Sequence, residues 1–316
     1  IGFSTHGSAE NILQMINSEK FSFVNLHYHY FGSYHAEGTT IGKGGHGNAE
    51  AVKRALQLDM GVFNISPVDK GGMLYRPSKV LARLIGPGMS PVCFGNLTSW
   101  KLQGHHTVSV GFARPADFEE SVMSAVIFAK GDYEAELKKI DERLQAQKSE
   151  KLGKEWVDKG MLNIPSCESE DTHAVGIGHV LWTHSVIKAF GMYDFAKARY
   201  DNLVSTTWNK KKTFEENMKK MPAGNMGRSY IEGEDYSKAL ANHYDPDLVI
   251  SKMKEVDSWF SKNSKVTPID LDSEAAYDLR GWNSFPGDNP TLPGVVLQVL
   301  TFGVFGCGGG PTKSCS

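Results

Sequence analysis

The chain has few cysteines and no long apolar run. Its four cysteines are too few and too scattered for a disulfide framework, so we expect a reducing compartment such as the cytoplasm or the interior of an organelle. Cys307 and Cys315 lack a second Cys-x-x-Cys or Cys-x-x-His pattern, which leaves free thiols, a tail disulfide, or a metal or iron–sulfur site open. No stretch of about 20 apolar residues occurs, so we expect no membrane-spanning helix.

An excess of charge of either sign is also missing. The 34 lysine and arginine residues almost balance the 36 aspartate and glutamate residues over 316 positions. A nearly neutral chain has no overall basic field to attract nucleic acid, so we expect no nucleic-acid partner. The 33 glycines follow no fixed period, which argues against a solenoid or a fibrous protein. Length and composition therefore favour a globular chain of one large domain or two domains.

Residues 1–130 alternate predicted strands with predicted helices. The four candidate strands are short apolar or β-branched segments that begin near Ile1, Phe21, Val62 and Thr107. Each is followed by a segment with a helix-start signal or helical spacing of apolar residues. Four β/α units in a row predict a parallel sheet. The first strand stands at the very start of the chain, so we expect the sequence to begin in the middle of a β/α fold.

The remainder of the chain is predicted to be a helical extension and a tail. Residues 131–265 are mainly helical, with apolar residues at helical spacing in 178–200 and 246–260. Residues 266–316 are rich in proline and glycine and carry an apolar stretch at 292–305. We expect this tail to act as a docking arm.

Four motifs occur in order along the first 130 residues. They are Gly-Phe-Ser-Thr-His-Gly at 2–7, Phe-Val-Asn-Leu-His-Tyr-His-Tyr at 23–30, Ile-Ser-Pro-Val at 65–68 ahead of Gly71, Gly72 and Leu74, and a segment from Val-Gly-Phe to Phe-Glu-Glu-Ser at 110–121. Together they resemble the fifth to eighth strands of the aldo-keto reductases, (β/α)8 barrels that bind a nicotinamide cofactor at the carboxyl ends of the strands.

The resemblance extends to about residue 260. Residues 154–200 are similar to the C-terminal extension of a long-chain branch of the family that is often associated with iron–sulfur clusters, although this chain lacks the cysteine clusters of that branch. The resemblance therefore implies an α/β fold that is the second half of a (β/α)8 TIM barrel, followed by a helical C-terminal extension. A missing barrel half or a partner chain would then close the half barrel, which otherwise exposes two sheet edges.

By the same resemblance, the chain carries a binding site for NADP. The family's pattern places the carboxamide of the nicotinamide on Ser4, Thr5 and Asn25, all of which can form the hydrogen bonds. Ile65 stands where the family has an aromatic residue that stacks on the nicotinamide. The further matched positions are Ser66 and Gly71 in the pyrophosphate loop, Arg114 near a 2′-phosphate and Glu120 near the adenine, whereas Asp117 and Ser121 replace the family's Arg and Asn.

No residue of this chain matches the family's acid–base tetrad of Asp, Tyr, Lys and His. Hydride transfer needs a proton donor to the carbonyl oxygen, and the family takes that donor from the first half of the barrel. Two hypotheses follow. The chain is part of an NADP-dependent aldo-keto reductase that acts on a carbonyl or alcohol, or it is a non-catalytic structural or docking subunit of a larger assembly.

Several other patterns have two interpretations. The histidines at 27, 29, 35 and 46 are compatible with a metal site or with ordinary positions beside a cleft. His105 and His106 precede a strand and are expected to be exposed. The glycine-rich stretch 42–47 lacks the Lys-Ser/Thr ending of a phosphate loop, and the lysines at 210–212 are expected to lie in a solvated turn.

Overall fold

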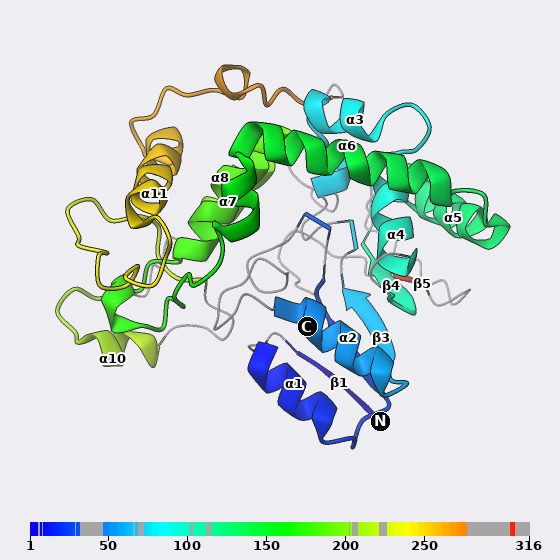
Figure 1. Ribbon diagram of the computed structural model, residues 1–316, viewed down its shortest axis with the longest axis horizontal. Coiled ribbons are helices and arrows are strands. Elements are labelled where there is room, and N and C mark those ends of the chain that lie inside the picture. Colours follow the sequence, from blue (N-terminus) through cyan, green and yellow to red (C-terminus); the bar gives the residue numbers. More distant parts are fainter. Residues whose placement is uncertain are drawn as a thin grey trace.

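The computed structural model describes residues 1–5, 7, 9–28, 30–31, 47–65, 67–68, 73–101, 104–111, 115–201, 203, 208–220, 226–276 and 304–306. In these residues a parallel sheet is flanked by helices, and a larger group of helices continues from it (Figure 1). The α/β class and the parallel sheet expected from the sequence are confirmed.

The strands lie in the sheet in the same order as in the chain. The sheet runs β1 (Gly2–Ser4), β2 (Phe23–Leu26), β3 (Gly61–Ile65), β4 (Thr107–Val110) and β5 (Val304–Gly306), with every neighbouring pair parallel. The first four correspond to the four predicted strands, with β2 shorter than the predicted run. β5 comes from the apolar stretch of the tail, which the sequence analysis assigned to a docking arm.

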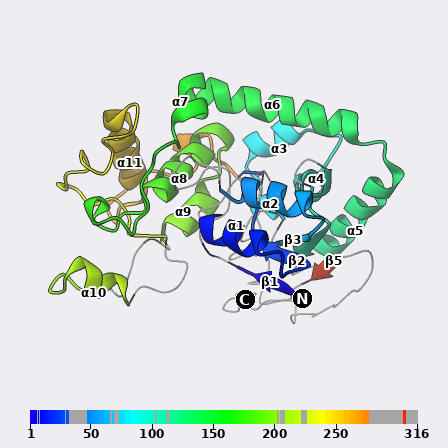
Figure 2. The ribbon, with the colours of Figure 1, turned by 60° about the horizontal axis from the view of Figure 1, so that its bottom comes forward.

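Three helices cover one face of the sheet. They are α1 (Ala9–Asn17), α2 (Gly47–Gln57) and α4 (Pro91–Lys101). α3 (Lys79–Ile85) packs on α4 and α6 (Glu134–Leu152), and α5 (Pro115–Lys130) packs on α4. Crossovers between parallel strands are right-handed as a rule, so a sheet whose strands follow the chain order receives its helices on one side. Figure 2 shows α1, α2 and α4 together above the strands.

A hydrophobic core fills the space between this face and the first two helices. Val24, Leu26 and Val62 point from the strands into it, and Ile12 and Ile16 of α1 complete it with the apolar side of α2. Alternation along a strand sends the intervening residues to the opposite face. Because the core residues of β2 alternate with Phe23 and Asn25, these two side chains lie on the face away from α1 and α2.

That second face is only partly covered. Residues in one row across the sheet are Ser4, Asn25, Phe63 and Thr107. Ser4 is exposed and Asn25 and Phe63 are half-buried. Phe23, one row earlier, is 37% exposed and lies 5.0 Å from the Phe63 ring. This face therefore carries the apolar rings of Phe23 and Phe63 beside the polar side chains of Ser4 and Asn25.

The helical extension surrounds one buried helix. It comprises α6 (Glu134–Leu152), α7 (Lys154–Lys159), α8 (Ile177–Phe190), α9 (Tyr193–Asp201), α10 (Phe214–Met218) and α11 (Pro246–Phe260), with short 3-10 helices at Met73–Tyr75, Glu170–Thr172 and Ile269–Leu271. α8 packs against α6, α9 and α11, and nearly all of its residues are buried. Its Trp182 Nε1 donates to the Phe31 carbonyl at 2.9 Å, which joins the extension to the loop after β2.

The predicted helical segment 178–200 is divided at Gly191. This residue has φ +64°, a left-handed conformation that ends α8 and that glycine adopts without steric cost. A Cβ here would lie 2.5 Å from the Asp272 carbonyl oxygen. The backbone of 272–276 packs back on the start of α3, where the Lys79 N–H donates to the Glu274 carbonyl at 2.7 Å. Part of the predicted tail is thus held against the body.

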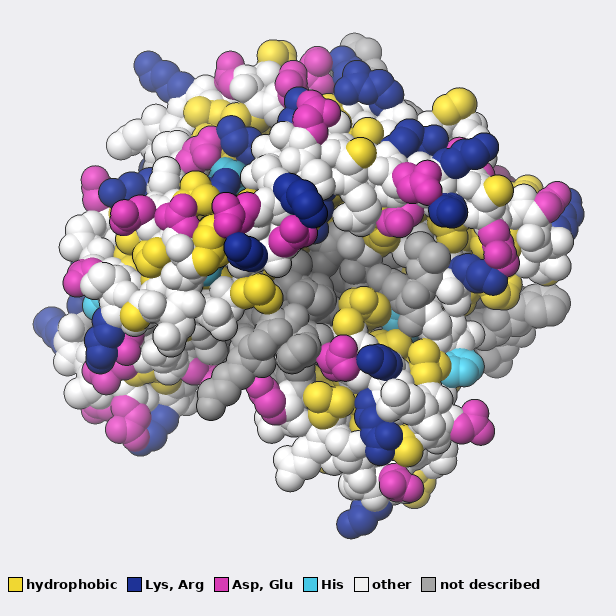
Figure 3. Space-filling model, in the orientation of Figure 1, with side chains coloured by type: hydrophobic (Ala, Val, Ile, Leu, Met, Phe, Trp, Pro, Cys, Tyr) yellow, Lys and Arg dark blue, Asp and Glu magenta, His cyan; other side chains and the backbone are white. Residues whose placement is uncertain are grey.

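No helix in the described ranges is long and apolar enough to cross a membrane. The charges at the surface are mixed as the composition suggests. Figure 3 shows acidic and basic side chains interspersed over the visible face.

Candidate functional site

Two predicted site residues lie side by side at the carboxyl ends of β1 and β2. Ser4 and Asn25 are register partners in the parallel ladder, so their side chains project from the same face of the sheet. The face is the one that α1 and α2 leave uncovered. The structure therefore brings together two of the three residues assigned to the carboxamide at a place where a ligand can reach Ser4.

The amide oxygen of Asn25 is buried and has no hydrogen-bond partner among the described residues. A buried polar atom without a partner costs free energy comparable to a lost hydrogen bond, roughly 1–3 kcal/mol. Native structures rarely keep such an atom without a reason. An N–H donor supplied by a ligand would satisfy this oxygen.

Thr5, the third of these residues, is held in the turn after β1. Its backbone N–H donates to the Asn25 carbonyl at 3.1 Å, which continues the ladder by one bond. Its Oγ1 accepts from the Gly7 N–H at 2.9 Å. Among the described residues the Thr5 hydroxyl donates to no acceptor, and the side chain also stabilises the β1–α1 turn.

Ile65 is the last residue of β3. It lies two residues beyond Phe63, the register partner of Asn25, so its side chain is on the same face of the sheet as Asn25. Its side chain is buried, and its carbonyl oxygen lies 3.1 Å from His27 Nδ1. His27 is itself buried, and Asn48 Nδ2 donates to its carbonyl at 2.7 Å. His27, just after β2, is therefore linked by hydrogen bonds to the last residue of β3 and to the start of α2.

The remaining predicted positions divide into two groups. Ser66, Gly71 and Arg114 lie outside the described residues. Glu120 lies on α5, where Asp117 and Ser121 are buried and Ser121 Oγ donates to the Asp117 carbonyl at 3.2 Å. The Glu120 carbonyl accepts from Ser124 Oγ at 2.8 Å. Glu120 is separated from Asn25 by β3 and β4 in the order of the sheet.

A buried polar network that includes none of the predicted site residues lies on the face of the sheet that the helices cover. Asn64 Nδ2 donates to the Tyr28 carbonyl at 3.0 Å and to Ser99 Oγ at 2.5 Å. Ser99 Oγ lies 2.9 Å from His105 Nδ1. The expectation that His105 is exposed is wrong, because its ring is buried between Ser99 and the edge of the Tyr28 ring; His106 is exposed as expected.

A second polar cluster lies in the helical extension around the buried His184, whereas Glu255 and Lys188 are partly exposed. His184 Nε2 lies 2.9 Å from Glu255 Oε2, and Lys188 Nζ lies 2.8 Å from Glu255 Oε1. The hydrogen bond from His184 lowers the pKa of Glu255 to about 2, and burial lowers the pKa of His184. A neutral imidazole that donates its Nε2–H to an ionised carboxylate accounts for the lowered pKa of Glu255 and the lowered pKa of His184. The His184 ring also stacks on Trp259 at 5.6 Å.

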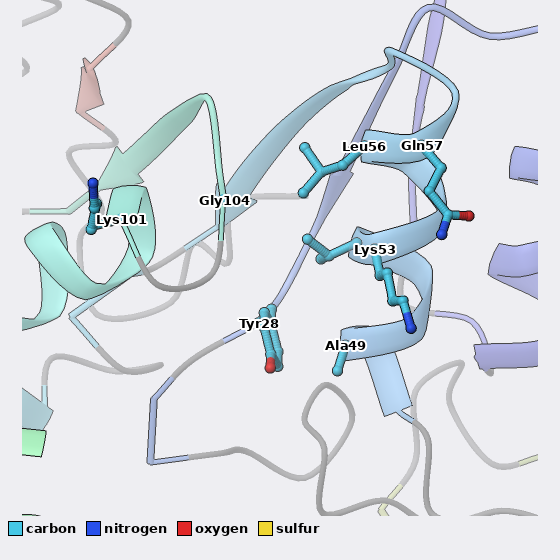
Figure 4. Close-up of a pocket in the computed structure, with 8 residues that line it drawn as sticks. Tyr28, Ala49, Lys53, Leu56, Gln57, Lys101 and Gly104 are labelled. Atoms are coloured by element: carbon cyan, nitrogen blue, oxygen red, sulfur yellow. The ribbon is translucent and has the colours of Figure 1, made fainter. Parts of the chain in front are cut away.

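A cavity of about 540 Å³ lies on the helix side of the sheet, away from Ser4 and Asn25. Figure 4 shows α2 along one side of it, with Leu56 directed toward Gly104 and Tyr28 at one end. Lys101 also lines this space, and its Nζ lies 2.5 Å from Glu134 Oε1. That hydrogen bond raises the pKa of the Lys101 ammonium. None of the predicted cofactor residues lines this cavity.

Within the described ranges, no three or more His, Cys, Asp and Glu side chains are grouped as metal ligands. His27 uses its Nδ1 toward Ile65, whereas residues 29, 35 and 46 lie outside these ranges. Cys93 is buried and Cys167 is half-buried, both as free thiols.

Comparisons with known proteins return no match. No protein-family model, no curated protein and no solved structure is significantly similar to this chain.

Proposed function

We propose that this chain forms the second half of a (β/α)8 barrel of the aldo-keto reductase type and binds NADP at the carboxyl ends of its strands. The cofactor supplies hydride transfer to or from a carbonyl or alcohol substrate. The proton donor for that step is not among the residues that match the family in this chain. In this proposal the other barrel half comes from a missing segment or a partner chain.

The order of the strands supports a barrel over the other common α/β architecture. A doubly wound sheet reverses its strand order at a switch point and carries helices on both faces. Here β1 to β4 follow one another without reversal, and α1 and α2 share one face with α4. A barrel has this arrangement because its second face forms the interior.

The observation that carries the cofactor proposal is the Ser4–Asn25 pair. A nicotinamide carboxamide offers two N–H donors and one carbonyl acceptor. The buried Asn25 Oδ1 can accept one of the N–H groups, and the exposed Ser4 hydroxyl can donate to the carbonyl. The residues present therefore fit this part of the cofactor.

A second candidate function is a non-catalytic docking subunit with the same fold. Ile65 favours it, because an aliphatic side chain can pack against a nicotinamide ring but cannot stack on it. The partly exposed Phe23 and Phe63 rings favour it as well, since they form an apolar surface on the uncovered face of the sheet. Such a surface suits contact with another protein.

A fluorescence titration of the full chain with NADPH tests the cofactor proposal. We expect saturable binding below millimolar concentration in the parent protein. Asn25→Leu keeps the approximate size of the side chain but removes the acceptor, and it should weaken binding about tenfold or more, because one hydrogen bond of roughly 1.4 kcal/mol is lost. Asn17→Leu, on the exposed end of α1, is the matched control and should bind like the parent.

Two results would contradict the proposal. Failure of the parent to bind NADPH at millimolar concentration would overturn the reductase-type function and favour the docking subunit. An equal effect of Asn25→Leu and Asn17→Leu would remove the Ser4–Asn25 pair as the cofactor site. Circular dichroism spectra that match the parent establish that both variants are folded.

A further inference from the structure

The outward face of α5 is apolar. Val122 is 44% exposed, Met123 is 56% exposed and Val126 is 41% exposed. Val122 and Met123 are adjacent, and Val126 follows them by four and three positions, so the three side chains form one continuous patch on the helix. We call the three side chains the α5 stripe.

This stripe is not the side by which α5 packs on the body of the protein. The opposite side of the helix carries Asp117, Ser121 and Ser124, all buried. Asn96 Nδ2 of α4 donates to Ser124 Oγ at 3.2 Å, which fixes that side against α4. A surface helix with one packed face normally has a polar face toward water. The α5 stripe is instead an apolar face that points away from the packed side of the helix.

Opposite charges stand at the two ends of the stripe. Glu119 lies three residues before Val122, and Lys130 lies four residues after Val126, so both are on the same side of the helix as the stripe. Both side chains are exposed. Neither takes part in an ion pair with any residue in the described part of the chain.

The arrangement is self-complementary for an antiparallel pair of helices. Residues 119 and 130 are equally distant from the midpoint between 124 and 125, and so are residues 123 and 126. When two copies of α5 run antiparallel across a two-fold axis, Glu119 of each copy faces Lys130 of the other. Met123 of each copy then faces Val126 of the other. A parallel alignment would instead place like charges together.

We propose that the α5 stripe is a self-association surface, on which a second copy of this chain docks its own α5 in antiparallel orientation. A two-fold interface uses the same patch on both partners, as this geometry requires. A single helix pair buries less than the roughly 1,200 Å² of a standard stable interface. The dimer is therefore weak and forms in a concentration-dependent way. This inference does not depend on the binding of a cofactor.

Sedimentation velocity of the full chain over a range of concentrations tests the proposal. The parent should show a reversible monomer–dimer equilibrium. Glu119→Lys and Lys130→Glu each replace two attractive pairs of the dimer by repulsive ones, and each alone should raise the dissociation constant roughly tenfold. An equimolar mixture of the two variants restores opposite charges at both ends, and it should associate about as tightly as the parent.

The mixing experiment separates this interface from other contacts. A monomeric parent at all concentrations would overturn the proposal and point to a different protein as the partner of the stripe. Single variants that associate like the parent, or a mixture no tighter than either variant, would overturn it too. Met123→Glu, placed on the exposed stripe, should abolish the dimer without changing the circular dichroism spectrum; an unchanged dimer would exclude α5 from the interface.

Discussion

The side-chain amide of Asn64 takes the place of a backbone peptide opposite Tyr28. Its Nδ2 donates to the Tyr28 carbonyl at 3.0 Å, and the Tyr28 N–H donates to its Oδ1 at 3.3 Å. The regular pairing of β2 with β3 ends at Leu26, which is the register partner of Asn64. The amide therefore extends the pairing past the end of β2 and holds the segment that leads away from Asn25.

Loss of this amide should be costly. Asn64→Leu leaves the N–H and carbonyl of Tyr28 without these partners in a largely buried place, and we expect the free energy of unfolding to fall by about 2–4 kcal/mol. Urea denaturation of both proteins gives this difference. Asn17→Leu is the control, because Asn17 accepts from Arg54 Nε at 2.7 Å but lies at the surface, and it should cost below about 1 kcal/mol. Equal losses in the two variants would contradict the structural role of Asn64.

Gly191 lies at the junction of α8 and α9, and replacing it should lower the stability of the protein. Gly191→Ala meets both a positive φ and the Asp272 carbonyl oxygen, whereas Gly131→Ala meets a φ of +80° with no atom within 4 Å. We expect Gly131→Ala to lower the free energy of unfolding by about 1 kcal/mol and Gly191→Ala by at least about 2 kcal/mol more. Thermal or urea unfolding measures both. Similar losses of stability in Gly191→Ala and Gly131→Ala would show that the Asp272 carbonyl oxygen does not crowd a side chain at position 191.

His184 predicts a pH dependence of stability. Burial lowers its pKa from the ordinary value of 6.5, so the unfolded chain binds this proton more readily than the folded protein does. The folded state is therefore favoured above pH 6.5, and stability is lost as the pH falls through that value toward the lower folded pKa. Protonation would also place a hydrogen on Nδ1, which has no hydrogen-bond partner among the described residues.

His184→Gln removes this titration and can keep a donor toward Glu255. Between pH 7 and pH 5 the parent should lose stability more steeply than the variant, by at most about 1.4 kcal/mol per pH unit for one group. The free energy of unfolding from urea curves at a series of pH values gives both slopes. Parallel curves for the two proteins would show that His184 does not titrate differently on folding.

The sequence allowed the parallel sheet to be predicted because its signals are local. Short apolar runs that alternate with helix starts define β/α units, and the carboxyl ends of parallel strands meet at one edge. Ser4 and Asn25 could therefore be expected as neighbours. The register that places them in one row depends on packing across the sheet, and the sequence alone does not specify it.

Other features depended on contacts between distant segments. α4 has no exposed face over 91–99, because all of these residues are buried, so the alternation of apolar and polar residues that reveals a surface helix is missing. A polar Asn64 inside an apolar strand is a visible signal, but its partner Ser99 and the His105 ring that Ser99 contacts are far along the chain. For the same reason His105 was wrongly expected at the surface. α8 ends at Gly191 in a left-handed conformation, and the carbonyl oxygen of the distant Asp272 leaves no room for a Cβ at this position.

The cofactor proposal is tested most directly by hydrogen–deuterium exchange of the full chain with and without millimolar NADPH. Backbone amides at the carboxyl ends of β1 and β2, in peptides that contain Thr5 and Asn25, should exchange more slowly when NADPH is present. The Asn25→Leu variant should lose most of this protection. No protection at millimolar NADPH, or protection confined to the cavity beside Leu56 or to the helical extension, would contradict the account.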